Sequence, residues 1–290
     1  MRLVCRGKAS EKHFLKALSM LELLEIPKEL EIFVIDDPKY CAEIIRPLPA
    51  HQTPIFRQFC NKERTSFSYS WGGKETIIIQ ITKENAFIST NLKAAAGLLA
   101  HEIMHTIMRR RGLDRHLADC YIASYYKNYP LLKKLDFPQA QLEDLFTAVG
   151  REAMMALKDL YVNTEVLALG LGDYLLEYYY NRLGTLKYRP MPVFFTEKAL
   201  MRKSTFQAMR DALLFQITLM PMHIPFQAYH HKDAKLLLKQ IEKCYERNVK
   251  EISREFHDVN ELVFYEFSPS CEFHKKYFKM VFMKTYKLLI

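Results

Sequence analysis

Residues 65–111 read TSFSYSWGGKETIIIQITKENAFISTNLKAAAGLLAHEIMHTIMRRR, and this stretch determines the fold that we expect. Residues 65–71 and 74–82 each alternate apolar and polar side chains, and Gly72-Gly73 separates them. Two alternating runs joined by two glycines predict a β-hairpin. Beyond the hairpin, Ser89, Thr90 and Asn91 can cap a helix, and the apolar residues then recur at helical spacing. We therefore expect a helix from about residue 92 to residue 111.

Working outward from this stretch, the rest of the chain reads as mostly helical. The run 31–36 favours a strand, and apolar residues at helical spacing predict helices over 11–25, 114–126, 141–169, 173–182, 196–219, 232–266 and 272–290. The fold class that we expect is α+β, mainly α-helical, with a small antiparallel sheet preceding the 92–111 helix. The best break in the chain is GTLKYRPMP at 184–192, which contains two prolines. It predicts one domain over 1–184 and a helical C-terminal domain over 185–290.

The composition is that of a globular protein. Of the 290 residues, 49% are hydrophobic and 26% are charged, which excludes disordered and collagen-like chains. The chain lacks an apolar run long enough to span a membrane, and its first residues lack the apolar core of a signal peptide. The six cysteines are scattered without C-x-x-C spacing, so we expect reduced thiols and a cytoplasmic protein. The net charge of +9 would suit a nucleic-acid partner but does not by itself support one.

The chemistry-bearing motif is HExxH, formed by His101, Glu102 and His105 within the 92–111 helix. Histidines four residues apart lie one turn apart on the same helical face, so both imidazoles can reach one metal ion. Neutral imidazole suits zinc. Glu102 lies about 100° further round the helix, from where its carboxylate can reach a water on the metal and act as general base.

The segment LLAHEIMHTIM resembles the active-site helix of the zincin metallopeptidases. The resemblance spans about residues 65–170. It implies that His101 and His105 bind zinc, that Glu102 is the general base, and that the edge strand of a small sheet binds extended peptide by β-augmentation. The metzincin branch would place a third histidine where this chain has Arg111, so the gluzincin branch is the better match. We could not assign a closer family from the sequence.

In gluzincins the third ligand is an acidic residue on a later helix, with a residue four positions on that orients a ligand histidine. Asp159 and Asn163 have this spacing and share an apolar face of the 141–169 helix. We therefore expect Asp159 to be the third ligand and Asn163 to hydrogen-bond a histidine, because a metal compensates a buried carboxylate. Glu165, on a different face, is the alternative third ligand. Further candidates are Glu152, Asp114, His116 and Asp119.

These residues predict an enzyme, a zinc metallopeptidase that acts on a peptide or protein substrate. The sequence leaves two alternatives open. One is a helical binding protein, with nucleic acid as a candidate partner and an accidental or inactive HExxH; the other is a zinc hydrolase with a non-peptide substrate. Cys271 and His274 have C-x-x-H spacing, but we find no second pair near them in the sequence and do not expect a second zinc site. Residues 272–290 form a basic amphipathic segment that suits a docked terminal helix or an anionic membrane surface. Substrate specificity, the oxyanion-stabilising residue and the oligomeric state cannot be read from the sequence.

Overall fold

A computed structural model describes residues 1–49, 60, 66–83, 85–185, 217, 222–243, 256–287 and 289. The chain forms two compact units, each built from two stretches of sequence. Unit 1 comprises Met1–Arg111 and Val162–Leu186, and unit 2 comprises Gly112–Tyr161 and Lys187–Ile290. This division differs from the boundary predicted near residue 184, because residues that follow the 92–111 helix share a core with the C-terminal helices.

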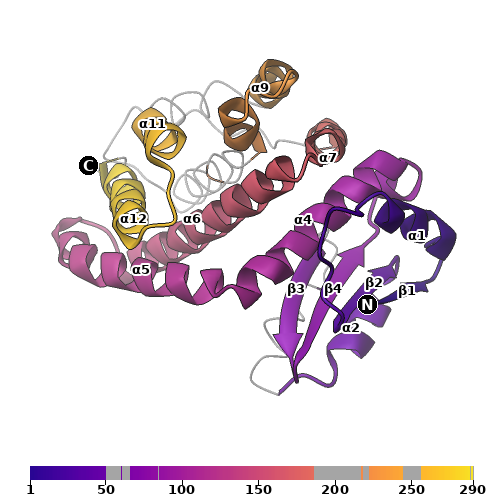
Figure 1. Cartoon of the computed structure of the whole chain (residues 1–290). Coiled ribbons are helices and arrows are strands. Elements are labelled where there is room, and N and C mark those ends of the chain that lie inside the picture. Colours follow the sequence, from indigo (N-terminus) through magenta and orange to yellow (C-terminus); the bar gives the residue numbers. More distant parts are fainter. Residues whose placement is uncertain are drawn as a thin grey trace. The chain divides into compact units, whose positions relative to one another are not determined.

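Unit 1 is built on a four-stranded mixed sheet in the order β1-β2-β4-β3 (Figure 1). The strands are β1 (Arg2–Arg6), β2 (Leu30–Ile35), β3 (Ser66–Trp71) and β4 (Lys74–Gln80). Strands β1, β2 and β4 are parallel to one another, and β3 is antiparallel to β4. The expected α+β, mainly helical class is confirmed. The sheet is mixed rather than purely antiparallel, because β1, which the sequence did not predict, and β2 are both parallel to their neighbours.

The predicted hairpin is present as β3 and β4. Trp71 pairs with Lys74, so Gly72 and Gly73 form the two-residue connection. Their φ angles are 59° and 78°. Positive φ at both central residues is the requirement of a type I′ turn, whose twist matches that of the two strands. The glycine pair therefore fixes the register of the hairpin that lies next to the HExxH helix.

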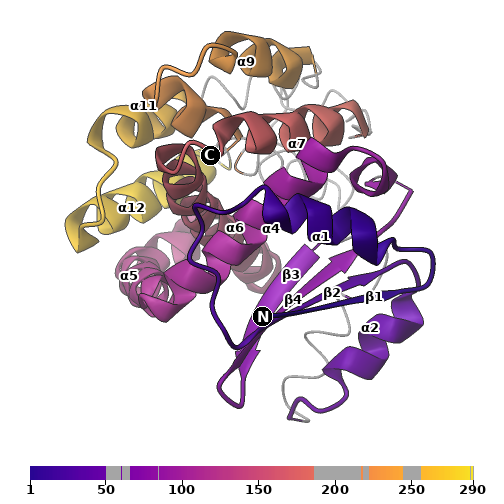
Figure 2. The same cartoon turned by 45° about the vertical axis from the view of Figure 1, so that its right-hand side comes forward.

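Helices cover both faces of this sheet (Figure 2). Helix α1 (Glu11–Ser19) packs against α4 (Leu92–Arg110), and α4 also contacts β3 and β4. Helix α2 (Pro38–Ile45) lies on the opposite face, where its apolar side chains pack against Ile78 of β4. Because side chains alternate along a strand, Ile77 and Ile79 face the side of α1 and α4, and all three isoleucines are fully buried. The unit is completed by η1 (Ala86–Ser89), the end of α6 (Gln139–Ala168) and α7 (Gly172–Thr185).

The core between α2 and the sheet contains a disulfide bond. Cys41 of α2 is bonded to Cys60, with the two Cα atoms 5.5 Å apart. The expectation that all six cysteines are reduced is therefore wrong for this pair. The two cysteines are 19 positions apart and have no motif spacing, so no local pattern in the sequence indicated the bond. Disulfides persist mainly in oxidising compartments, so the cysteines do not support the expected cytoplasmic location.

Among the described residues of unit 2, all the regular elements are helices. Its elements are α5 (Leu113–Asn128), η2 (Tyr129–Lys134), the longer part of α6, α9 (Ala234–Lys243), α11 (His257–Glu266) and α12 (Cys271–Lys287). Apolar side chains of α5, α6, α11 and α12 form one core, in which Leu157, Tyr277 and Leu117 are fully buried. The predicted 232–266 helix is represented by α9 and α11, and the predicted 196–219 helix falls almost entirely outside the described residues.

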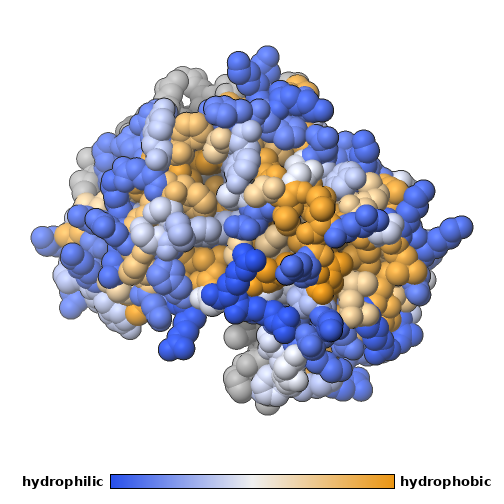
Figure 3. Space-filling model, viewed as in Figure 1, coloured by the Kyte–Doolittle hydropathy of each residue, from blue (hydrophilic) through white to orange (hydrophobic). Residues whose placement is uncertain are grey.

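The surface of the described residues mixes charged and apolar side chains. Hydrophilic residues cover much of the face seen in Figure 3, with apolar groups between them. Among the described helices, none combines the length and the apolar character that crossing a membrane requires. The expected absence of a membrane-spanning helix therefore holds for the part of the chain that the structure describes.

Candidate metal centre

Helix α4 carries the HExxH motif on a buried segment of unit 1. The side chain of Asn91 caps the helix by accepting a hydrogen bond from the Ala94 amide at 3.1 Å. The Asn91 amide group also donates to Glu177 of α7 at 2.6 Å. Further along α4, Gly97 lies so close to α7 that a Cβ atom would clash with the Tyr174 carbonyl. The cap and the glycine together fix how α4 lies against α7.

The two motif histidines lie side by side on α4. The Nε2 atom of His101 is 3.1 Å from the Nε2 atom of His105, and the rings meet edge to face. His101 is buried, with 8% of its surface exposed, while His105 is half-buried. Two imidazole nitrogens held this close can share one ion, since zinc–nitrogen bonds are about 2.0–2.1 Å long. The residues present therefore fit a zinc ion.

Helix α6 supplies a residue that orients His101. The side-chain oxygen of Asn163 lies 2.8 Å from Nδ1 of His101, and the Asn163 amide nitrogen donates to the Tyr179 hydroxyl at 2.7 Å. Because the amide group of Asn163 faces Tyr179, its oxygen accepts the proton of Nδ1. The Nε2 atom of His101 then carries a lone pair, which is the state in which an imidazole binds a metal. Asn163 is fully buried, and Tyr179 is 3% exposed.

Glu102 points toward the hairpin. Its Oε1 atom accepts a hydrogen bond of 2.5 Å from the Ser66 hydroxyl, at the first residue of β3. Only 6% of the surface of Glu102 is exposed, although the residue is charged in its ordinary state. A buried carboxylate is costly unless hydrogen bonds or a cation stabilise it. A metal ion held by the neighbouring histidines would provide such a cation next to Glu102.

A second contact ties α4 to the hairpin. The guanidinium group of Arg109 lies 2.8 Å from a carboxylate oxygen of Glu75 and donates to the Ser68 carbonyl at 3.1 Å. Glu75 is on β4 and Ser68 is on β3. The ion pair is largely buried, since the side chains of Arg109 and Glu75 are 21% and 7% exposed. It holds β3 along the same side of α4 that carries Glu102.

The acidic candidates for a third ligand have different surroundings. Asp159 lies one turn before Asn163 in α6, so the two residues share a face of one uninterrupted helix. Glu165, the alternative, has a side chain that is 43% exposed and lies 3.8 Å from Arg111.

The remaining candidates have other neighbours. Among the described contacts, Asp114 pairs with Lys158 at 3.0 Å, Glu152 with Arg151 at 3.6 Å, and His116 with His274 at 3.0 Å. Asp119 is exposed. Asp159 is the acidic candidate that lies one helical turn from Asn163, the residue of α6 whose side chain contacts His101.

Two residues of this centre were missed in the sequence. Ser66 belongs to an alternating strand, so nothing local separates its role from that of Ser68 or Ser70. Tyr179 is the middle residue of three consecutive tyrosines, which favour core packing. Both residues act through contacts between elements far apart in sequence, which local spacing does not report.

Comparison with known proteins identified no relative of this chain. No family model matches the chain, and no curated protein or solved structure matches it either. The resemblance of the HExxH helix to the zincins therefore stays a prediction, and any functional proposal depends on the geometry described above.

Proposed function

We propose that this protein is a zinc-dependent hydrolase, with a peptide or protein as substrate. One observation carries the proposal: two imidazole nitrogens 3.1 Å apart lie beside a buried carboxylate on the same helix. The hydrogen bond from His101 to Asn163 adds weight, because it directs the lone pair of His101 toward His105. Two core histidines without a ligand would not need this arrangement.

Asp159 is the third ligand in this proposal. Its support is local, since helix α6 continues unbroken from Asp159 to Asn163, whose side chain touches His101. Two histidines and one carboxylate are the ligand set of several catalytic zinc sites, which keep one further position open.

Each residue of the centre has a distinct role in the proposed hydrolysis. Zinc, when bound, supplies Lewis-acid chemistry, lowering the pKa of water and polarising a carbonyl oxygen. Glu102 accepts the proton of the attacking water and returns it to the leaving amine. Ser66 donates to one carboxylate oxygen and so fixes the rotamer of Glu102. Asn163 and Tyr179 keep the His101 ring in place.

A peptide is the substrate class that the surroundings favour. Strand β3 has β4 as its one neighbour in the sheet order of the described strands, and its first residue touches Glu102. An extended peptide can add to the edge of a sheet through main-chain hydrogen bonds. A peptide that pairs with the Ser66 end of β3 would therefore have its backbone close to Glu102.

The test measures zinc and activity in the same set of variants. His101→Ala and His105→Ala should each lose one zinc equivalent relative to the wild type, because each removes a ligand. Glu102→Gln should keep the zinc and lose hydrolysis of a fluorogenic peptide library by about 10²-fold or more. Zinc is counted by elemental mass spectrometry on the purified full-length chain.

Each outcome discriminates between the alternatives. Unchanged zinc in both histidine variants would contradict the proposal and favour a binding protein with an accidental HExxH. Zinc loss in Glu102→Gln would show that Glu102 is a ligand and not a base. Zinc loss as expected, without hydrolysis of any peptide in the library, would exclude a peptidase and leave a hydrolase of another substrate class.

A further inference from the structure

We infer that unit 2 holds a second, structural zinc ion, bound by His116, Cys120, Cys271 and His274. Each pair of residues comes from one helix. His116 and Cys120 lie one turn apart on α5, and Cys271 and His274 lie three residues apart in the first turn of α12. Helices α5 and α12 pack against each other within unit 2.

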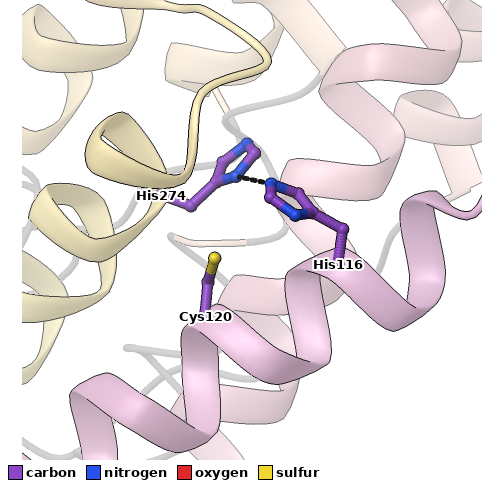
Figure 4. A group of neighbouring side chains, drawn as sticks. All are labelled: His116, Cys120 and His274. Atoms are coloured by element: carbon purple, nitrogen blue, oxygen red, sulfur yellow. Dashed lines mark hydrogen bonds between the residues drawn. The ribbon is translucent and has the colours of Figure 1, made fainter.

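Three of the four donor atoms form one group, and the fourth, the sulfur of Cys271, lies next to the sulfur of Cys120. The Nε2 atom of His116 lies 3.0 Å from Nδ1 of His274, and the two sulfur atoms of Cys120 and Cys271 lie 2.9 Å apart. The donor atoms of His116, Cys120 and His274 all lie within 4.8 Å of one another. Figure 4 shows these three side chains pointing toward one another from α5 and α12.

The nitrogen–nitrogen distance is close to that of a tetrahedral zinc site, and the sulfur–sulfur distance is shorter than in such a site. Zinc–nitrogen bonds of about 2.0–2.1 Å and zinc–sulfur bonds of about 2.3 Å place two nitrogens about 3.3 Å apart and two sulfurs about 3.8 Å apart. The observed separations are within about 1 Å of both values. Two cysteines with two histidines are a common ligand set of structural zinc, and four protein ligands leave no position open for a substrate.

A hydrogen bond outside the cluster sets His274 in the state that a metal needs. The Tyr161 hydroxyl donates its proton to the Ser268 carbonyl at 2.6 Å. Its oxygen therefore accepts from Nε2 of His274, which is also 2.6 Å away. With its proton on Nε2, His274 presents the lone pair of Nδ1 toward His116. This is the way in which the partners of ligand histidines in zinc sites fix the tautomer.

Burial agrees with a closed site. His274 is fully buried and Cys120 is 2% exposed. Two thiolates would balance the double charge of zinc, as a buried site requires.

This inference does not depend on the HExxH centre. The two pairs that form the cluster are about 150 residues apart, since 151 residues separate Cys120 from Cys271. The C-x-x-H spacing of Cys271 and His274 therefore had no partner near it in the sequence. His116 and Cys120 supply the other two ligands, and the ion would link α5 to α12 within unit 2.

Cobalt substitution tests the site on the full-length wild-type chain. Cobalt(II) bound by thiolates gives a charge-transfer absorption band in the near ultraviolet, and the ligands proposed for the HExxH centre contain no sulfur. We expect this band in the reduced, cobalt-loaded wild type and in the His101→Ala/His105→Ala double variant. Cys120→Ser and Cys271→Ser should each abolish it and reduce the zinc content by one equivalent. Cys5→Ser, which changes a free cysteine of β1, should leave both unchanged.

Two results would overturn the inference. One is the absence of a thiolate–cobalt band in reduced wild-type protein, which needs no variant and so does not depend on how a variant folds. The other is a disulfide between Cys120 and Cys271, found by peptide mass spectrometry in protein purified with zinc under nitrogen. Loss of hydrolysis in the histidine double variant with the band retained would support both sites as independent.

Discussion

Asp159 is the proposed third zinc ligand, and substituting it is the most direct test of the ligand set. Asp159→Ala should lower zinc affinity at the HExxH centre strongly, because it removes a ligand. Asn163→Ala should lower it by about 10–100-fold, the usual effect of losing the partner of a ligand histidine. Zinc affinity is measured by competition with a chromophoric chelator.

Glu165→Ala is the matched control, since it removes a carboxylate from the same helix that pairs with Arg111 at 3.8 Å. It should leave the zinc affinity unchanged. If Glu165→Ala released zinc and Asp159→Ala did not, the ligand would be the glutamate of an ordinary gluzincin, and Asp159 would have a supporting role.

Ser66 allows a separate test of how Glu102 is held. Ser66→Ala removes the hydroxyl that donates to Glu102 and leaves the two histidines unchanged. Hydrolysis should fall by less than in Glu102→Gln, and zinc should remain bound, because Ser66 positions the base without replacing it. Ser70→Ala is the control, as Ser70 lies on the same strand near its exposed end. Equal activity of the two serine variants would show that the hydrogen bond has no catalytic role.

At the scale of elements, the packing of α4 against α7 is the contact that supports the HExxH helix. Gly97→Ala should lower the free energy of unfolding by about 1–3 kcal/mol, because the added methyl group meets the Tyr174 backbone, which cannot rotate away as a side chain can. In an open helix position the same substitution would stabilise by about 0.5–1 kcal/mol. Chemical denaturation measures the difference.

Gly184 of α7 provides that comparison. A Cβ atom at Gly184 has nothing within 4 Å, so Gly184→Ala should be neutral or stabilising. A loss of stability at Gly184 equal to that at Gly97 would mean that the α4–α7 contact is not the cause.

Some elements of the fold could be predicted from the sequence and others could not. Hairpin β3–β4 and helix α4 were predicted because glycine pairs, caps and periodicity are local signals. Strand β1 was missed because its five residues have arginine at both ends and little alternation. The mixed sheet was missed with it, since parallel pairing joins residues far apart in the chain.

The same limit applies to the metal sites. The HExxH motif is visible because its ligands are four residues apart on one helix. The cluster of His116, Cys120, Cys271 and His274 is divided between two helices, and neither half forms a recognisable motif on its own. The contacts of Ser66 and Tyr179 arise only after the sheet and α7 have packed on α4 and α6.

At the scale of the whole molecule, the disulfide between Cys41 and Cys60 is a covalent cross-link that the sequence did not predict. Closing a loop of 19 residues restricts the unfolded chain and stabilises the fold by about 3 kcal/mol. Cys41→Ser/Cys60→Ser should lower the Tm of the oxidised protein, measured by calorimetry. Cys5→Ser should change it little. Equal melting of wild type and double variant would show that the bond does not form in solution.

The bond also changes the topology of the chain, because it makes residues 41–60 a closed ring from which the two chain ends leave at the same point. One cut by a protease within this ring leaves every residue of the protein covalently connected. Such a nicked molecule keeps its full mass on a denaturing gel without reductant and separates into two fragments once reductant is added. A cut outside the ring separates the fragments in both gels, so a pair of gels locates the cut without sequencing.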